Sequence, residues 1–310
     1  MDLWNLAIRI LFLSQITIGM LGNSSLIFYY LILYCREYTL KPTDLILMHL
    51  MAANALIILS AGVPQTMAAW GFKHFLDDFG CTLLLYIQGF VRSVSIGIMC
   101  LLSVFQALTI SPRKSCWKDQ KVKVEKNIGC HIFLLWVMYM LINFIHIAYT
   151  FVNRNSKNVT RRRDFEYCSI VVQYEISEYL YAALVVLPEV FFSVLMAWSS
   201  GSMIVILYRH KQRVQHIRCT HGSRRISPES RVTQNILILV STFLAFYTFF
   251  SILRGFISLL YYQNWWLINI NRLTSLCFPS FVPFYLVYHY SIVSKHCLVW
   301  IRNKKNVISF

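Results

Sequence analysis

Long stretches without Asp, Glu, Lys or Arg constrain this chain more than any other feature of its sequence. Four of them are 22 to 28 residues long: 10–35, 45–72, 127–153 and 273–294. Three more contain a single charge each: 79–112 with Arg92, 179–208 with Glu189, and 232–271 with Arg254. Because a helix crosses a bilayer with about 20 mostly apolar residues, each of the seven segments is long enough to span a membrane.

The seven segments predict a membrane protein built from helices. Only 14% of the 310 residues are charged, whereas soluble domains have about 25%. Strands of a membrane barrel are about ten residues long and alternate in polarity, and these segments show neither property. We therefore expect an all-α protein, one domain over residues 1–310 that forms a bundle of seven transmembrane helices. The expected helices are 8–35, 45–70, 81–110, 128–152, 179–208, 232–261 and 271–294.

The basic residues between the segments predict how the chain is oriented. Of the Lys and Arg outside the segments, 19 fall on one side and eight on the other. Because Lys and Arg are retained on the cytoplasmic side during insertion, we expect a multi-pass plasma-membrane protein with an extracellular amino terminus and a cytoplasmic carboxyl terminus. The cluster Arg161 to Arg163 on the outer side weakens this asymmetry without reversing it. Asp2 and the long first segment argue against a cleavable signal peptide.

The net charge of +16 has two interpretations that fit a membrane protein. Basic loops follow from the topology and from attraction to anionic membrane lipid, and the third inner loop is in addition a candidate for docking a protein partner. Nucleic acid is disfavoured as a partner, because the basic clusters occupy short loops between membrane spans. Cys297, just after the last segment, is a weak candidate for palmitoylation.

Three ionisable residues within the predicted spans are candidates for a ligand site. Charged side chains are costly in a membrane and usually serve a function there. Arg92, Glu189 and Arg254 fall in the outer half or near the middle of their helices, which favours a polar cavity open to the outside. Phe90 and Phe256 would give it aromatic walls, although aromatic residues near a membrane interface ordinarily act as anchors. The alternative is a structural salt bridge of Glu189 with Arg92 or Arg254.

Other function classes receive little support from the sequence. It has no nucleophile elbow, zinc-binding helix or phosphate-binding loop, so we expect neither an enzyme nor a bound cofactor or metal. An odd number of helices fits poorly with a transporter made of inverted halves. The chain also has no filter loop or ring of like charges. A carrier or channel therefore remains the alternative to a receptor.

Two cysteines lie on the predicted outer side, where thiols oxidise. A disulfide between Cys81 and Cys168 would hold the long outer loop across the mouth of the bundle, and two free thiols are the alternative. In the same loop, Asn158-Val159-Thr160 matches the N-glycosylation pattern. In the seventh segment, Pro283 removes a helical hydrogen bond, so it is a candidate hinge for opening the cytoplasmic face, or else a static kink.

Several motifs make the chain similar to a known family. Residues 102–112, Leu-Ser-Val-Phe-Gln-Ala-Leu-Thr-Ile-Ser-Pro, and residues 279–285, Pro-Ser-Phe-Val-Pro-Phe-Tyr, resemble motifs of vomeronasal type-1 receptors, which are G-protein-coupled pheromone receptors. Residues 49–54, 62–71 and 78–81 resemble further segments of that family. The chain has neither the acidic-Arg-Tyr triplet nor the Asn-Pro-x-x-Tyr motif of rhodopsin-like receptors. Bitter-taste receptors also lack the triplet and are the second choice.

The resemblance implies a function and a set of site residues. It implies a pheromone or odorant ligand among the outer helix halves, a disulfide between Cys81 and Cys168, a glycan on Asn158, and coupling to an inhibitory-class heterotrimeric G protein. Arg92 and Arg254 slightly favour anionic ligands. We expect basic residues of the second and third inner loops to contact the G protein: Lys114, Lys118, Lys121, Lys123, Arg213 and Arg218.

Overall fold

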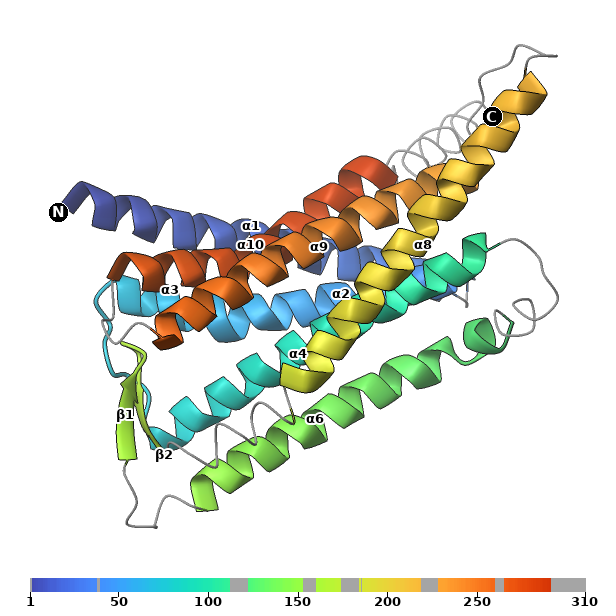
Figure 1. Ribbon diagram of the computed structural model, residues 1–310. Coiled ribbons are helices and arrows are strands. Elements are labelled where there is room, and N and C mark those ends of the chain that lie inside the picture. The colour runs from blue at the N-terminus through green and yellow to red at the C-terminus, as the bar shows by residue number, and fades with distance from the viewer. Residues whose placement is uncertain are drawn as a thin grey trace, which may run out of the picture.

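Long helices packed side by side make up most of the protein (Figure 1). The computed structural model describes residues 2–37, 40–111, 122–152, 160–173, 184, 186–218, 228–259 and 265–290. The elements are α1 (Asp2–Glu37), α2 (Pro42–Ile57), the π-helix η1 (Ile58–Gly62), α3 (Val63–Ala69), α4 (Asp78–Ile110), α6 (Ile128–Val152), β1 (Thr160–Asp164), β2 (Ser169–Gln173), α8 (Leu187–Arg218), α9 (Pro228–Leu259) and α10 (Trp265–Tyr290).

Six helical spans within the described residues are long and apolar enough to cross a membrane. They are Leu6–Arg36, Pro42–Ala69, Asp78–Ile110, Ile128–Ile145, Leu187–Arg209 and Gln234–Leu253. The outward faces are apolar too: the side chains of Phe28, Phe133 and Trp198 are 65%, 65% and 76% exposed. Soluble monomers rarely expose apolar surface on this scale, so these faces suit lipid.

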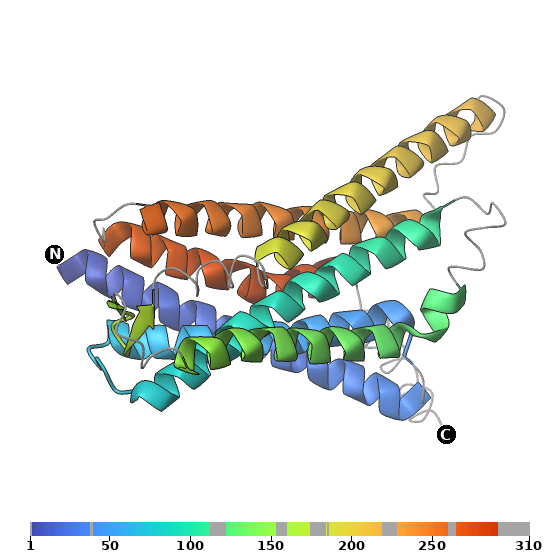
Figure 2. The same cartoon turned by 60° about the horizontal axis from the view of Figure 1, so that its bottom comes forward.

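Some helices extend beyond the charge-free segments that predicted them. α8 continues to Arg218 rather than ending at residue 208, and Figures 1 and 2 both show this part projecting away from the bundle. The added residues are rich in Arg, Lys and Gln, which favour helix in water, so the helix continues past the apolar segment. α10 already begins at Trp265, six residues before the predicted start, and residues 291–294 lie outside the described part of the chain.

A proline explains the π-helix in the second span. Pro64 has no N–H group, and its ring would clash with the carbonyl of Ser60, four residues earlier. The chain widens at Ile58–Gly62 instead of continuing as a regular α-helix. The Ser60 carbonyl accepts a hydrogen bond of 2.7 Å from Gln88 Nε2 of α4. The kink in the second span is therefore fixed to the third.

A second proline position is fixed by α1. Pro283 cannot donate to the Pro279 carbonyl, which instead accepts a hydrogen bond of 2.9 Å from Asn23 Nδ2. Asn23 is fully buried. Pro283 lies one turn after Pro279 and packs against Gly22 of α1. A Cβ added to Gly22 would lie 2.7 Å from Pro283 Cγ, so only glycine permits this close packing. The candidate hinge of the last helix is thus held directly against the first.

The sequence did not predict the small antiparallel sheet in the second outer loop. β1 pairs with β2 from Thr160 opposite Gln173 to Asp164 opposite Ser169. β2 contains Ile170, Val171 and Val172, which are residue types enriched in strands. The hairpin lies at the same end of the bundle as the amino terminus (Figure 1). We call this end the disulfide end, and the end where α4 finishes at Ile110 the motif end.

Candidate functional site

A cavity of about 50 Å³ lies between α2, α4, α9 and α10. Its walls are mainly aromatic, formed by Phe243, Phe246, Tyr247, Phe250 and Phe278. Its polar lining comes from Arg92, Ser95, Thr274 and Ser275. Sites that hold drug-sized molecules have volumes of about 300–1,000 Å³. A whole ligand of that size therefore requires the surrounding side chains or helices to move.

Arg92 is the charged residue of this lining. Its Cζ atom lies 4.5 Å from the centroid of the Phe250 ring, close enough for a cation–π interaction. Since arginine stays protonated under all ordinary conditions, the cavity has a permanent positive charge on its wall.

Glu189 lies next to the cavity and is held by hydroxyl groups. Its carboxylate accepts hydrogen bonds from Ser93 Oγ at 3.0 Å and from Tyr247 OH at 2.6 Å. The side chain is buried, and the contacts join α8 to α4 and α9. Among the described residues, no ion pair joins Glu189 to Arg92. An ion pair is found there between Arg272 and Glu166. The side chain of Arg254 lies outside the described residues.

Of the two aromatic residues predicted for the pocket, Phe90 lies outside the observed lining. Phe90 stacks on Tyr86 at 6.0 Å and meets Trp136 of α6 edge-on at 5.6 Å, away from the cavity. Phe90 and Arg92 are two residues apart, which separates them by about 200° around a helix, so they face different neighbours. The side chain of Phe256 lies outside the described residues.

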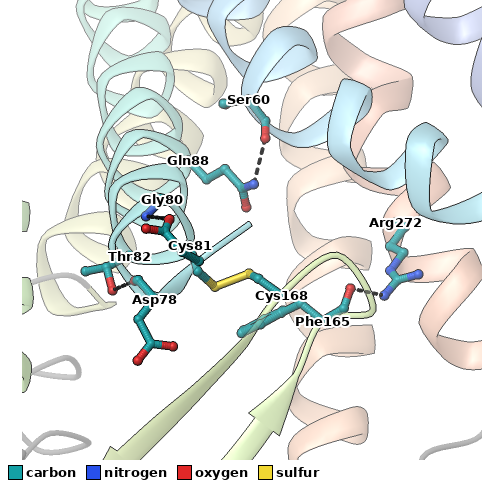
Figure 3. The surroundings of a disulfide bond; sticks show 10 residues. Ser60, Asp78, Gly80, Cys81, Thr82, Gln88, Phe165, Cys168 and Arg272 are labelled. Atoms are coloured by element: carbon teal, nitrogen blue, oxygen red, sulfur yellow. Dashed lines mark hydrogen bonds between the residues drawn. A yellow bond between two sulfur atoms is a disulfide. The ribbon is translucent and has the colours of Figure 1, made fainter. Parts of the chain in front are cut away.

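A disulfide attaches the hairpin to α4 at the disulfide end of the bundle. Cys81, at the start of α4, is bonded to Cys168 in the turn of the hairpin, and both are buried (Figure 3). The carboxylate of Asp77 accepts a hydrogen bond of 2.8 Å from the Gly80 N–H and so caps α4. The cap and the disulfide fix where the hairpin is attached.

The turn of the hairpin, residues 165–168, has further attachments, and we call it the lid. Arg272 Nη2 of α10 donates to the Phe165 carbonyl at 3.2 Å (Figure 3). Arg272 Nη1 lies 3.2 Å from a carboxylate oxygen of Glu166. The Glu166 carbonyl accepts a hydrogen bond of 2.9 Å from the His74 N–H. Glu166 has a φ of 71°, a left-handed conformation that is uncommon for this residue type. The lid is therefore fixed to α10 and to the loop before α4.

Tyr167 is buried in the lid beside Cys168, with 3% of its surface exposed. Burial raises the pKa of Tyr167, while a hydrogen bond with Gln88 and the positive charges of Arg272 and Arg92 act in the opposite direction. Gln88 also donates to the Ser60 carbonyl. The lid thus connects, through Gln88, to the kink of the second span.

Neutral hydrogen bonds join the helices at the motif end. The hydroxyl groups of Ser103 and Ser199 are bonded to each other. Gln106 Nε2 donates to Thr43 Oγ1 at 3.4 Å, and Tyr285 OH donates to the Asn235 carbonyl at 2.8 Å. Ser103 and Gln106 belong to the motif 102–112, and both are buried. The motif therefore ties α4 to α8 and α2.

Several predicted residues cannot be assigned contacts. Lys123 is exposed just before α6. Arg213 and Arg218 lie in α8, but their side chains are outside the described residues. The following residues are wholly outside the described residues: Lys114, Lys118, Lys121, Asn158 and Cys297. Among the described residues, no group of three or more His, Cys, Asp or Glu side chains is placed to hold a metal.

Most of the residues that surround Arg92 and Glu189 were not predicted from the sequence. Ser95 follows Arg92 by three residues, so helical spacing alone places it on the same face. Ser93 and Tyr247 gave no signal, because hydroxyl groups in apolar helices are common. Arg272 was not singled out as a candidate site residue.

Comparisons with known proteins agree with the resemblance seen in the motifs. Residues 6–299 match the model of the vomeronasal organ pheromone receptor family. The chain is 45% identical to human vomeronasal type-1 receptor 4 over 94% of its own length and 96% of that protein. It is 43% identical to human vomeronasal type-1 receptor 2, over 94% of this chain and 74% of that protein. Mouse vomeronasal type-1 receptor 45 is 35% identical over 78% of this chain and 76% of that protein.

These matches confirm the family that motifs 102–112 and 279–285 indicated, and they cover nearly the whole chain. They also fit a chain with several membrane-spanning helices and a disulfide. The chain belongs to the vomeronasal type-1 family of pheromone receptors, which are multi-pass plasma-membrane proteins and not enzymes.

Proposed function

We propose that this protein is a G-protein-coupled chemosensory receptor. It binds a pheromone-like small molecule in the cavity beside Arg92 and activates an inhibitory-class heterotrimeric G protein. The observation that carries the proposal is the cavity itself, which combines a permanent cation with aromatic walls below a lid fixed by a disulfide. Such a site suits an amphipathic small molecule that enters from the disulfide end.

We propose that α10 is the seventh membrane span. Its 26 residues correspond to about 39 Å of helix, more than the roughly 30 Å of a bilayer core. The polar residues Asn269, Thr274 and Ser280 lower the hydropathy of α10. They are buried within the bundle and do not face lipid, so they are compatible with a membrane span. Seven spans place the two termini on opposite sides, and the excess of basic residues at the motif end supports an extracellular amino terminus.

The charges around the cavity favour a ligand with an anionic or strongly accepting group. The Glu189 carboxylate is already occupied by two hydroxyl donors. Arg92 lines the cavity and supplies charged N–H donors. A partly buried arginine binds a carboxylate, sulfate or phosphate group more strongly than a neutral group.

Coupling would occur at the motif end. The extension of α8 to Arg218 carries basic residues beyond the bundle. Lys123, which precedes α6 in the sequence, is exposed. We propose that ligand binding favours an arrangement in which α9 moves outward there and α10 bends at Pro283. The basic residues of the inner loops then contact the G protein: Lys114, Lys118, Lys121, Lys123, Arg213 and Arg218. Ligand affinity must differ between the two arrangements for this to happen.

The test is nucleotide exchange on an inhibitory-class G protein in membranes that contain the receptor. The stimulus is a panel of volatiles and of neutral and sulfated steroids. Arg92→Gln should abolish the response of a receptor that still reaches the surface. Arg9→Gln is the matched control, because Arg9 also lies over an aromatic ring, that of Trp70 at 5.9 Å, but lies outside the lining of the cavity.

Two results would contradict the proposal. Equal responses in wild type and Arg92→Gln would remove Arg92 from the ligand site. Ligand-dependent flux across the membrane without nucleotide exchange would indicate a carrier or channel. The coupling surface is tested separately by Lys121→Glu and Arg213→Glu, which should lower exchange without changing surface delivery.

A further inference from the structure

We infer that Ser95 is a specificity-determining residue of the ligand site. Its hydroxyl group binds a second polar group of the ligand, a hydroxyl or a carbonyl, while Arg92 binds the anionic group. The inference rests on the proposed function, since it concerns the same cavity. It extends that proposal from one recognised group to two.

The Ser95 hydroxyl is buried and unused. The residue is 3% exposed and lines the cavity. Within the part of the chain that the structure describes, Ser95 Oγ has no hydrogen-bond partner. An unpaired buried hydroxyl destabilises the folded state, and native proteins contain few of them. A ligand that bonds to this group would remove the penalty.

The other hydroxyl groups of the cavity are all engaged. Thr274 Oγ1 donates to the Ile270 carbonyl at 2.7 Å, and Ser275 Oγ donates to the Arg272 carbonyl at 2.6 Å. Tyr247 OH donates to Glu189. Bonding to a carbonyl three or four residues earlier is the usual state of a serine within a helix. Ser95 is the exception in this lining, so its hydroxyl is the one available to a ligand.

The positions of Arg92 and Ser95 define the ligand further. The two residues are three apart on α4, which separates them by about 4.5 Å along the helix and places them on the same face. Around them stand flat apolar surfaces, including Phe243 and Phe278, whose rings meet edge-on at 4.7 Å. A hydroxyl group both donates and accepts. The matching ligand is therefore an organic anion with a flat apolar body and one additional hydroxyl or carbonyl group.

The experiment compares three sulfated steroids that differ at a single ring carbon close to the one that bears the sulfate, because Arg92 and Ser95 are only about 4.5 Å apart along α4. One has a hydroxyl group there, one a carbonyl and one only hydrogen. Potency is measured by nucleotide exchange in membranes containing the intact receptor. Wild type should respond to the hydroxyl or carbonyl compound at a concentration about five- to tenfold lower than to the third, the effect of one hydrogen bond.

Variants at two positions make the comparison specific. Ser95→Ala should remove the preference by lowering the potency of the hydroxyl and carbonyl compounds alone, and Ser95→Thr should keep it. Ser202→Ala is the matched variant, because it removes a hydroxyl that bonds to the Trp198 carbonyl of its own helix and lies outside the lining of the cavity, and it should leave the preference as in wild type. If Ser95→Ala reduces surface delivery, Ser95→Cys, a weaker donor of similar size, gives the second measurement and should reduce the preference.

The outcomes separate this inference from the proposed function. A wild-type preference that persists in both Ser95→Ala and Ser95→Cys overturns the role of Ser95, and so does a wild type that responds equally to all three compounds. In both cases the receptor function stands. Silence of surface-delivered wild type toward all three compounds contradicts the proposed ligand class and overturns the inference with it.

Discussion

The two ends of the bundle are held together by different kinds of interaction. At the disulfide end, a covalent bond joins Cys81 to Cys168 and an ion pair joins Arg272 to Glu166. At the motif end, the contacts described between helices are neutral hydrogen bonds such as that of Tyr285 OH with the Asn235 carbonyl. Charged groups and a covalent bond therefore concentrate where the ligand is proposed to enter.

This difference indicates which end can change its arrangement. A disulfide cannot exchange partners on the timescale of signalling. A neutral hydrogen bond contributes only about 0.5–1.5 kcal/mol, and the free energy that couples two sites is typically about 1–3 kcal/mol. Ligand binding can therefore supply enough free energy to rearrange contacts at the motif end, but not to release the lid.

The largest effect is expected at the disulfide. Cys168→Ser removes a bond between residues 87 positions apart, and loss of a disulfide of this kind costs about 2–5 kcal/mol. We expect a several-fold loss of receptor at the cell surface and a lower temperature of thermal inactivation. Cys130→Ser is the control, because Cys130 is an exposed free thiol. Equal surface levels for the two variants would show that the lid is held without the disulfide.

A charged hydrogen bond should matter more than a neutral one. Tyr247→Phe removes a donor to the buried Glu189 carboxylate, for which we expect a loss of about 1.5–3 kcal/mol. Tyr86→Phe removes a neutral bond of 3.2 Å to the Met140 carbonyl and should cost about 1 kcal/mol or less. Thermal inactivation in detergent measures both. The reverse order would mean that Glu189 contributes little to joining α4, α8 and α9.

The packing of α1 against α10 should tolerate no added methyl group. Gly22→Ala places a Cβ 2.7 Å from Pro283 Cγ, and overpacking of this kind costs about 1–3 kcal/mol. Gly201→Ala is the matched control on α8, where a Cβ meets nothing within 4 Å. It should stabilise the protein by about 0.5–1 kcal/mol. Stabilisation by both substitutions would show that Pro283 moves away from α1 easily.

The sequence predicted the helices better than it predicted their contacts. Charge-free segments located the spans because the bilayer excludes charge whatever the tertiary structure. The helix ends were less predictable, since residues 209–218 are polar but favour helix, so α8 continues past the charge-free segment. The hairpin depends on pairing between two short strands on either side of the disulfide, and no periodic pattern marked it.

The candidate site was predictable only in part, for a similar reason. Arg92 and Glu189 were found because ionisable residues in a membrane are conspicuous by type alone. The donors to Glu189 come from α4 and α9, and Tyr247 is 58 residues away in the sequence. Ser95 lies at helical spacing from Arg92, but its lack of a partner is a property of the packed structure. Residue type predicts where a site lies, and packing decides which groups remain available to it.

The smallest change in stability should come with a change in signalling. Tyr285→Phe removes the neutral bond between α10 and the Asn235 carbonyl of α9, at a cost of about 0.5–1.5 kcal/mol. Since α9 is proposed to move outward during activation, we expect nucleotide exchange without ligand to rise several-fold. Tyr139→Phe is the control, because its buried hydroxyl has no partner among the described residues. Reduced stability with unchanged nucleotide exchange would mean that the Tyr285 bond is structural only. The contacts at the motif end would then rearrange no more easily than those at the disulfide end.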